Sequence, residues 1–360
     1  MDRCTGRTGL RVGRRGLPAA SLSLALLLTG CSTSLPEGAS TGAVSSAPGS
    51  PGVTSSVSPA QTVPDRPRDD VPLVGNPLAG HELFASPYTA AAEAAYQAEG
   101  TEEGALLARL AEVSTGFWLL PEVHPEGEVG AHVADIAMQA QEVGKVPVFV
   151  VYGIPQRDCI HGYSEGGASV DGYLSWVQEI AENAGTGSIV VLEPDAIASV
   201  SSCRLDHDRL ELLHDAVGIL AAGPVTYVDA GHSAWIDAET IARRLDKVGV
   251  HRVRGFSLNV AGYGAEDGER VFGNRVSSLL GGSFFVVDTG RAGAGYDGSW
   301  CNPGGRAVGA LPGPVDWGGA MDGRLWVKPP GESDGTCGGG PEAGEFWTER
   351  AVEMMRAAGW

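Results

Sequence analysis

The chain has 360 residues, of which 43% are hydrophobic and 19% charged, a balance typical of a globular protein with a large buried core. Asp and Glu number 44 against 25 Lys and Arg, so the formal net charge is −19, which disfavours binding to nucleic acid or to an anionic membrane surface. No apolar run reaches the roughly 18 residues that a membrane-spanning helix needs.

Residues 1–31 have the layout of an export signal. A basic segment ends at Arg14-Arg15, an apolar stretch runs from Leu17 to Leu28, and small residues follow. The sequence Leu28-Thr29-Gly30-Cys31 resembles the bacterial lipobox, whose cysteine is lipidated and becomes the first residue of the mature protein. We therefore predict an exported protein, extracellular or at the cell surface, with a lipid anchor at Cys31 as its only link to a membrane. Ordinary cleavage and full secretion are the alternative.

Residues 32–75 are predicted to form a disordered linker. The segment consists largely of Ser, Thr, Pro, Gly and Ala, and no aromatic residue occurs between Ser32 and Phe84. Such a sequence cannot bury enough apolar surface to offset the chain entropy lost on folding. We expect it to act as a stalk in front of a folded domain that spans residues 76–360.

The cysteines support export. Cys4 falls within the signal and Cys31 is the lipidation candidate, so four of the six cysteines remain for the folded domain: Cys159, Cys203, Cys301 and Cys337. Four cysteines allow three disulfide pairings, and their spacing leaves the choice open. No metal site is predicted, because the chain has neither a CxxC pair nor an HExxH motif.

The folded domain alternates short apolar runs with stretches of helical periodicity. The predicted strands are Gly116–Leu120, Val146–Tyr152, Ser188–Leu192, Val225–Val228, Gly255–Leu258, Phe284–Val287 and Arg324–Val327. The predicted helices include Asp171–Ala184, Leu205–Ala221, Ala238–Val248, Glu266–Leu280 and Ala343–Ala358. Apolar strands joined by helices predict an α/β fold with a parallel sheet covered on both faces. The domain length favours a barrel over an open sheet, although the pattern alone does not separate the two.

Polar side chains follow six of the predicted strands, at the edge where parallel α/β folds bind ligands. In chain order they are Asp158, Asp195, Asp229, Asn259, Asp288 and Lys328, and Glu332 and Asp334 come soon after Lys328. A single aspartate in such a place can be a helix N-cap. Four aspartates at or just beyond the ends of predicted strands, beside a lysine and a glutamate, exceed that need. Crowded carboxylates raise one another's pKa, and hydrolysis of a glycosidic bond requires one carboxylic acid that stays protonated.

Tryptophans occur near the same strand ends, namely Trp118, Trp235 and Trp300. Aromatic rings beside carboxylates, without clusters of basic residues, suit the apolar faces of sugar rings, although each ring can also serve as partly buried core. The sequence therefore favours a carbohydrate as the ligand of this edge.

Several longer motifs include these residues, namely Val150-Val151-Tyr152 with Arg157-Asp158-Cys159, Leu192-Glu193-Pro194-Asp195, Asp229-Ala230-Gly231-His232-Ser233-Ala234-Trp235, Asp288-Thr289-Gly290-Arg291, Trp300-Cys301-Asn302-Pro303 and Lys328-Pro329-Pro330-Gly331-Glu332-Ser333-Asp334-Gly335. Together they are similar to motifs of glycoside hydrolase family 6, the cellulase family of endoglucanases and cellobiohydrolases. The resemblance runs from about Asn76 to the C-terminus. It implies a distorted, incompletely closed parallel α/β barrel of about seven strands, and inverting hydrolysis of β-1,4-glucan by a monomer without metal or organic cofactor.

The resemblance also implies roles for individual residues. Asp195 matches the general acid, Asp229 an aspartate that supports the acid's raised pKa, and Asp158 an aspartate linked to the acid and to water activation. Asp334 matches the residue proposed as base, although a base acting through a chain of waters is also argued for the family. Tyr152 matches a ring beside the distorted sugar. Substrate contacts are implied for Trp118, Ser164, Trp235, Asn259, Trp300, Lys328 and Glu332, and disulfides for Cys159–Cys203 and Cys301–Cys337. Ala261 departs from the family, which often has a serine there, so one hydroxyl contact is lost.

Short segments between the paired cysteines predict an open cleft, and therefore an endoglucanase. A cellobiohydrolase of the same family is the first alternative, and a glucan-binding lipoprotein without activity is the second. A remote third is a serine esterase, because Gly162-Tyr163-Ser164-Glu165-Gly166 matches GxSxG.

Overall fold

The computed structural model describes residues 75–205 and 207–360, so the predicted signal, Cys31 and residues 32–74 of the predicted linker lie outside the described part. One mixed sheet has the strand order β1-β2-β3-β4-β5-β6-β8-β7. Its strands are β1 (Phe117–Leu119), β2 (Val148–Val151), β3 (Ile189–Leu192), β4 (Val225–Asp229), β5 (Gly255–Leu258), β6 (Phe284–Asp288), β7 (Gly313–Pro314) and β8 (Met321–Leu325). All neighbours pair in parallel except β7 and β8. Because β1 and β7 stand at the two ends of this order, the barrel is incompletely closed, as predicted.

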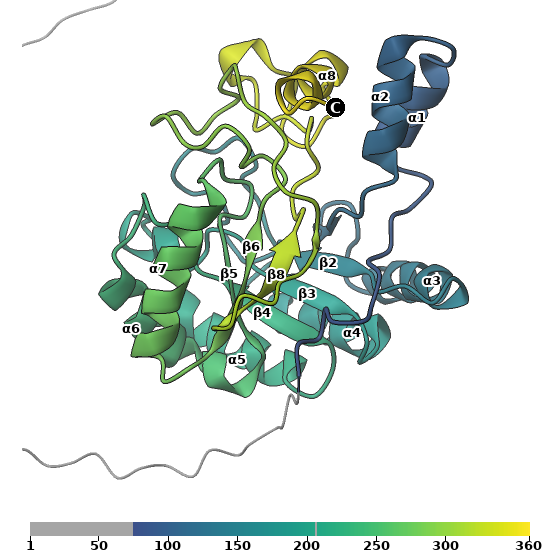
Figure 1. Ribbon diagram of the computed structural model, residues 1–360. Coiled ribbons are helices and arrows are strands. Elements are labelled where there is room, and N and C mark those ends of the chain that lie inside the picture. The colour runs from purple at the N-terminus through teal and green to yellow at the C-terminus, as the bar shows by residue number, and fades with distance from the viewer. Residues whose placement is uncertain (1–74, 206) are drawn as a thin grey trace, which may run out of the picture. The chain divides into compact units, whose positions relative to one another are not determined.

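Helices follow the strands and cover the outside of the sheet (Figure 1). They are α3 (Val129–Glu142), α4 (Tyr173–Ala184), α5 (Arg209–Leu220), α6 (Ala238–Val248) and α7 (Glu266–Leu279), with short 3₁₀ turns at η1 (Ala198–Ser201), η2 (Val250–Arg252) and η3 (Cys337–Gly339). Side chains alternate along each strand. In β2, Phe149 and Val151 join the cluster that packs against these helices, whereas Val148 and Val150 join the cluster inside the barrel.

Three helices near the chain ends form a second group. α1 (Ala90–Gln97) and α2 (Glu102–Ala111) pack on α8 (Thr348–Ala357), with Leu107, Trp326 and Met355 buried between them. Figure 1 shows α1 and α2 beside α8, apart from the helices around the sheet. The sequence prediction contained α8 but missed α1, α2 and α3.

The last parallel strand was predicted at Arg324–Val327 and lies instead at Met321–Leu325. The error has a physical cause, because Asp322 and Gly323 interrupt the apolar pattern inside the true strand. Asp322 is buried and accepts hydrogen bonds from Arg254 Nη2 at 2.6 Å and from Tyr227 Oη at 2.7 Å. A paired charge thus occupies a position where a strand pattern calls for an apolar residue.

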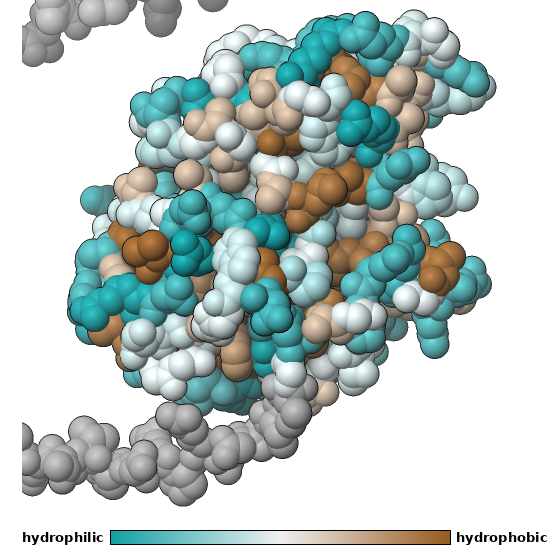
Figure 2. All heavy atoms as spheres, in the orientation of Figure 1, coloured by the Kyte–Doolittle hydropathy of each residue, from teal (hydrophilic) through white to brown (hydrophobic). Residues whose placement is uncertain are grey.

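The face of the molecule shown in Figure 2 is mostly hydrophilic. Figure 2 shows it in teal and white, with brown hydrophobic side chains in small groups, several of them in the region between α2, α8 and α3. Among the described residues, no helix has the length and apolar character to cross a membrane.

Candidate active site

The predicted site residues gather at the carboxyl ends of the parallel strands. Trp118 lies in β1, Tyr152 directly follows β2, and Asp229 is the last residue of β4. Asp195, Asn259 and Lys328 come within a few residues of the ends of β3, β5 and β8. Parallel strands end at one edge, so residues that are far apart in the chain become neighbours there.

Asp195 lies in a turn with unusual backbone geometry. Its φ is 69°, in the left-handed region that residues with a side chain rarely adopt. Its backbone N–H donates to Asp229 Oδ2 at 2.8 Å, which holds the turn in this conformation. Burial, and after it the negative charge of Asp158, raises the pKa of Asp195 to about 7, while Lys328 opposes the shift. A carboxyl group with this pKa is still about half protonated at pH 7.

Asp229 is buried beneath this turn. Its Oδ2 also accepts a hydrogen bond from Gly231 N at 3.1 Å, and its Oδ1 accepts one from Ser257 Oγ at 3.3 Å. Burial and the neighbouring Asp195 raise the pKa of Asp229 well above its ordinary value. The two carboxyl groups therefore disfavour simultaneous ionisation, and their protonation is shared.

Asp158 begins a loop that carries Ser164 back to it. Asp158 Oδ2 accepts hydrogen bonds from Ser164 N at 2.7 Å and Ser164 Oγ at 3.1 Å, and Ser164 Oγ lies 3.1 Å from Tyr152 Oη. Arg157 holds the loop in place by donating hydrogen bonds from Nε to Ser164 O at 2.9 Å and from Nη1 to Glu122 Oε2 at 2.9 Å. This network fixes the positions of Asp158, Ser164 and Tyr152 relative to one another.

Ser164 is not a nucleophile elbow. An elbow places serine in a sharp turn between a strand and a helix. Here the loop continues past Ser164, and the next helix, α4, begins only at Tyr173. The esterase interpretation of the GxSxG match is therefore wrong.

Asp334 is surrounded by donors. Its Oδ1 accepts from Arg291 Nη1 at 2.8 Å and Lys328 Nζ at 2.7 Å, and its Oδ2 accepts from Tyr263 Oη and Asn302 N, both at 3.0 Å. Although burial works in the opposite direction, Arg291 and Lys328 hold the pKa of Asp334 well below its usual range. A carboxylate held in this way has little tendency to accept a proton.

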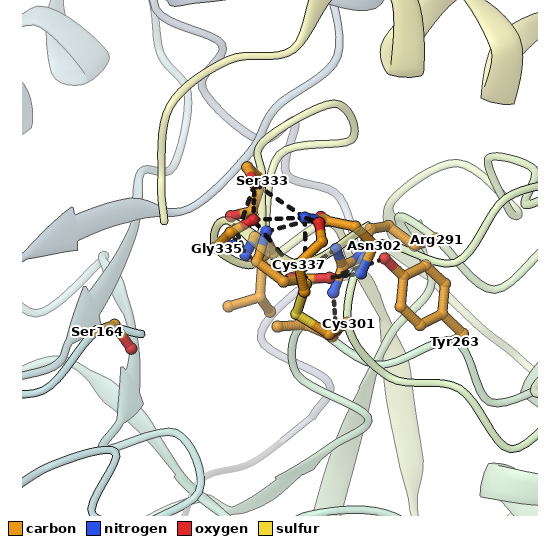
Figure 3. Close-up of polar contacts among 12 residues, drawn as sticks. Ser164, Tyr263, Arg291, Cys301, Asn302, Ser333, Gly335 and Cys337 are labelled. Atoms are coloured by element: carbon orange, nitrogen blue, oxygen red, sulfur yellow. Dashed lines mark hydrogen bonds and ion pairs between the residues drawn. A yellow bond between two sulfur atoms is a disulfide. The ribbon is translucent and has the colours of Figure 1, made fainter. Parts of the chain in front are cut away.

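Asn302 organises the loop around Asp334. It is buried with a φ of 45°, and its Nδ2 donates to Gly335 O at 2.7 Å and Cys337 O at 3.0 Å. Figure 3 shows this cluster with Arg291 and Tyr263 beside the disulfide, and Ser164 apart from it on another loop. Both disulfides implied by the resemblance are present, with Cα–Cα distances of 5.7 Å for Cys159–Cys203 and 6.2 Å for Cys301–Cys337.

Two further groups complete the strand ends. Asn259 Nδ2 donates to Asp288 O at 2.9 Å, and Asp288 Oδ2 in turn accepts from Ala261 N and Lys328 N. Asn259 thus fixes the backbone of this edge in the structure. Burial raises the pKa of Glu332 to about 7, opposed by the positive charge of Lys328.

The aromatic side chains line hollows at this edge. Trp235, Asp158 and Asp195 line a hollow of about 30 Å³, so the two aspartates face the same small hollow as Trp235. Trp118 meets the Tyr152 ring edge-on, with 5.1 Å between the ring centroids. Trp300 is 39% exposed. The structure therefore brings Trp118, Trp235 and Trp300 to the same edge of the barrel as the aspartates.

The two disulfide-bonded loops touch each other. The rings of His161 and Trp300 lie 4.1 Å apart between centroids, and Tyr163 packs on Gly335, where a Cβ atom would come within 2.5 Å of the tyrosine ring. Gly335 follows Asp334, and Tyr163 precedes Ser164, which binds Asp158. The contact therefore joins the loops that carry two of the site aspartates.

Sequence reasoning assigned no role to Arg291 or Tyr263, which both contact Asp334. Arg291 stands in the quoted Asp288-Thr289-Gly290-Arg291 motif, so its position carried a signal; Tyr263 carried none. Across residues 75–205 and 207–360, no group of three or more His, Cys, Asp or Glu side chains is arranged to hold a metal ion.

Comparisons with known proteins agree with this geometry. The model of glycosyl hydrolases family 6 matches residues 78–358. Endoglucanase A of Cellulomonas fimi is 41% identical over 77% of this chain, and the aligned part spans 62% of that protein's length. The solved endoglucanase Cel6 from Mycobacterium tuberculosis, in complex with methyl-cellobiosyl-4-deoxy-4-thio-β-D-cellobioside, is 41% identical, covers 79% of this chain and 100% of its own, and has a TM-score of 0.76. The catalytic core of the cellobiohydrolase Cel6A from Chaetomium thermophilum is 26% identical over 79% of this chain and 99% of its own, with a TM-score of 0.69.

Proposed function

The chain belongs to glycosyl hydrolases family 6, and on this premise we propose that it is an inverting endo-β-1,4-glucanase that cuts cellulose or a related β-glucan. The observation that carries the proposal is the environment of Asp195. Burial and the neighbouring Asp158 keep this carboxyl group protonated near neutral pH, which is the state that a general acid needs. Relatives of 41% identity that are named endoglucanases support the choice of reaction.

In this mechanism Asp195 protonates the leaving oxygen of the glycosidic bond. Asp229 orients it by accepting the Asp195 N–H, and Asp158 raises its proton affinity. As the bond breaks, positive charge develops on the sugar, and the carboxylates of Asp158 and Asp334 stabilise that charge. Tyr152 lies beside the reacting sugar, supported by its contact with Ser164.

The attacking water gives its proton to Asp158 rather than to Asp334. Asp334 already accepts hydrogen bonds from four donors, two of them cationic, and its pKa is held low. Its role is to hold Lys328 and Arg291 in place beside the substrate. Asp158 uses one oxygen, Oδ2, to bind Ser164, so a water that binds Ser164 would also lie near this carboxylate.

The test is the activity of Asp195→Ala on carboxymethyl cellulose, followed by viscosity and by the release of reducing ends. We expect a loss of at least about a hundredfold, with early product appearing as the α-anomer by proton NMR. The matched control is Asp237→Asn, because Asp237 is an exposed N-cap of α6 and asparagine caps equally well. A loss below tenfold in Asp195→Ala, or early β-anomer, refutes the proposal.

A cellobiohydrolase remains the second candidate, because the loops that carry Tyr163 and Gly335 touch each other and partly enclose the site. The same assay separates the two. Internal cutting lowers the viscosity quickly for few reducing ends, whereas exo cutting releases mainly disaccharide at nearly constant viscosity. A fall in viscosity that precedes most of the reducing-end release supports the endoglucanase.

We also propose that the enzyme is exported and lipid-anchored at Cys31. Two disulfides in the described part of the chain support an oxidising environment. Replacing Cys31 by Ala in the full chain should move the enzyme from the membrane fraction to the medium. If the wild-type enzyme is found in the medium to the same extent as the Cys31→Ala variant, ordinary secretion is favoured.

A further inference from the structure

A second hollow opens beside Trp118, and Asp158, Asp195 and Asp229 are not among its lining residues. Its volume is about 280 Å³, close to the lower limit of the range of about 300–1,000 Å³ typical of ligand sites. The start of α1, the end of α2, β1 and the loop after β8 form its walls. The lining residues that matter here are Tyr88, Ala90, Thr115, Trp118, Pro330 and Glu332.

The hollow adjoins the site already described. Trp118 lines it, contacts Tyr152 edge-on, and is fixed by a hydrogen bond from its Nε1 to Val327 O at 3.0 Å. Glu332 also lines it, and Lys328 and Asp334 both act electrostatically on that carboxyl group. A glucan chain that passes Trp118 on its way out of the reaction centre would therefore enter this hollow.

The lining suits a neutral sugar. Tyr88 is 86% exposed, and together with Pro330 it presents apolar surface of the kind that packs on the faces of glucose rings. The hydroxyl of Thr115 and the carboxyl of Glu332 are able to bond sugar hydroxyls. None of the described residues that line the hollow is Lys or Arg, so it offers no counter-charge for an anionic ligand.

The walls are also fixed before any ligand arrives. Leu107 and Leu110 of α2 are buried against α8, in the cluster that contains Met355. A site with fixed walls loses little free energy to ordering when it binds.

We propose that this hollow is an additional carbohydrate subsite, which binds one glucosyl unit of the substrate beyond Trp118. The proposal rests on the proposed glucanase function and extends it to the length of chain that the enzyme recognises. An enzyme that cuts inside a polymer must leave room for the chain at both ends of its site. The hollow provides that room on the Trp118 side.

Two variants test the subsite. Tyr88→Ala removes the exposed ring, and Ala90→Trp fills the hollow from an exposed position at the start of α1. Each should lower kcat/KM on cellohexaose about threefold to tenfold, the range expected for one ring contact, and leave cellotetraose nearly unaffected. With cellohexaose labelled at its reducing end, the bond that is cut should also shift. The control is Tyr96→Ala, because Tyr96 is 75% exposed on α1 but does not line the hollow.

The subsite is refuted if both variants match Tyr96→Ala on cellohexaose, or if both lower activity on cellotetraose and cellohexaose equally. Unchanged melting temperatures would show that the variants remain folded. These outcomes are distinct from failure of the proposed function, which would appear as cellotetraose hydrolysis by Asp195→Ala at more than a tenth of the wild-type rate.

Discussion

Replacing Asp195 by Asn should inactivate the enzyme and stabilise it at the same time. Burial of the side chain, and after it the negative charge of Asp158, raises its pKa to about 7. Asparagine has almost the same shape but cannot ionise. The variant should therefore lose about a hundredfold or more in turnover while losing the electrostatic strain of the wild-type site.

The magnitude follows from proton linkage. In the unfolded chain an aspartate ionises near pH 3.9, whereas in the folded protein Asp195 holds its proton until about pH 7. Between these values the folded state binds more protons than the unfolded state, so the free energy of unfolding falls as the pH rises. Three pH units at about 1.4 kcal/mol each give roughly 4 kcal/mol as the upper limit of this loss.

Urea unfolding of wild type and Asp195→Asn at pH 4 and pH 8 measures the effect. The two proteins should differ little at pH 4, where both side chains are neutral. At pH 8 the variant should be more stable by roughly 2–4 kcal/mol. Equal stability at pH 8, or a gain of the same size at both pH values, would show that the Asp195 carboxyl group is not strained by its neighbours.

Three other substitutions probe the same site. Asp334→Asn should destabilise the protein by about 3–5 kcal/mol at pH 7, because it leaves Arg291 and Lys328 without their carboxylate. The loss should shrink below about pH 4, where the aspartate of the unfolded chain takes up a proton while the native ion pair is still ionised; stabilisation at pH 7 would contradict the lowered pKa. Replacing Cys159 and Cys203 by Ser should lower the free energy of unfolding by roughly 4 kcal/mol, since the bridge closes a separation of 44 residues, and an unchanged urea midpoint would argue against this. Tyr163→Ala should open the contact at Gly335 and raise the rate of viscosity loss on carboxymethyl cellulose relative to the rate on cellotetraose; an unchanged ratio would mean that the loop contact does not limit access of the polymer.

Elements whose signals lie within their own sequence were predicted well. α6 spans Ala238–Val248, as predicted, because its apolar face is regular and both ends carry strong signals. The Asp237 side chain accepts a hydrogen bond from Thr240 N at the start, and Gly249 adopts a left-handed φ of 80° at the end.

Elements that depend on distant partners were predicted poorly. α1 consists largely of alanine, and only Ala91 of its residues is buried, so its sequence has little hydrophobic periodicity. It is stabilised by α2, which packs on α8 about 250 residues later in the chain. The apolar pattern could not reveal that pairing. The prediction of β8 was wrong for the same reason. Asp322 in this strand is paired with Arg254, which directly precedes β5 and is distant in the chain.

The positions of the site residues could be predicted from strand order, and crowding predicted that one carboxyl group would stay protonated. Parallel strands bring their ends together, so Asp158, Asp195, Asp229 and Asp334 were expected to lie close to one another. Each residue type, however, has one ordinary pKa, and the environment decides the direction of the shift. Burial and the charge of Asp158 raise the pKa of Asp195, whereas Arg291 and Lys328 outweigh burial at Asp334 and lower its pKa.

We base the proposed roles of Asp195 and Asp334 on these opposite pKa shifts. A group that holds its proton at pH 7 can act as an acid, and a group that stays ionised between two cations can stabilise positive charge but is a weak base. Arg291, which follows the end of β6, contributes to the low pKa of Asp334 by donating a hydrogen bond to its carboxylate. Asp334 lies in a loop that Asn302 and the Cys301–Cys337 disulfide hold in place. Spacing along the chain gives no information on such a contact. For this reason the sequence could suggest Asp334 as a base, whereas our proposal of Asp158 in that role depends on contacts that only the structure supplies.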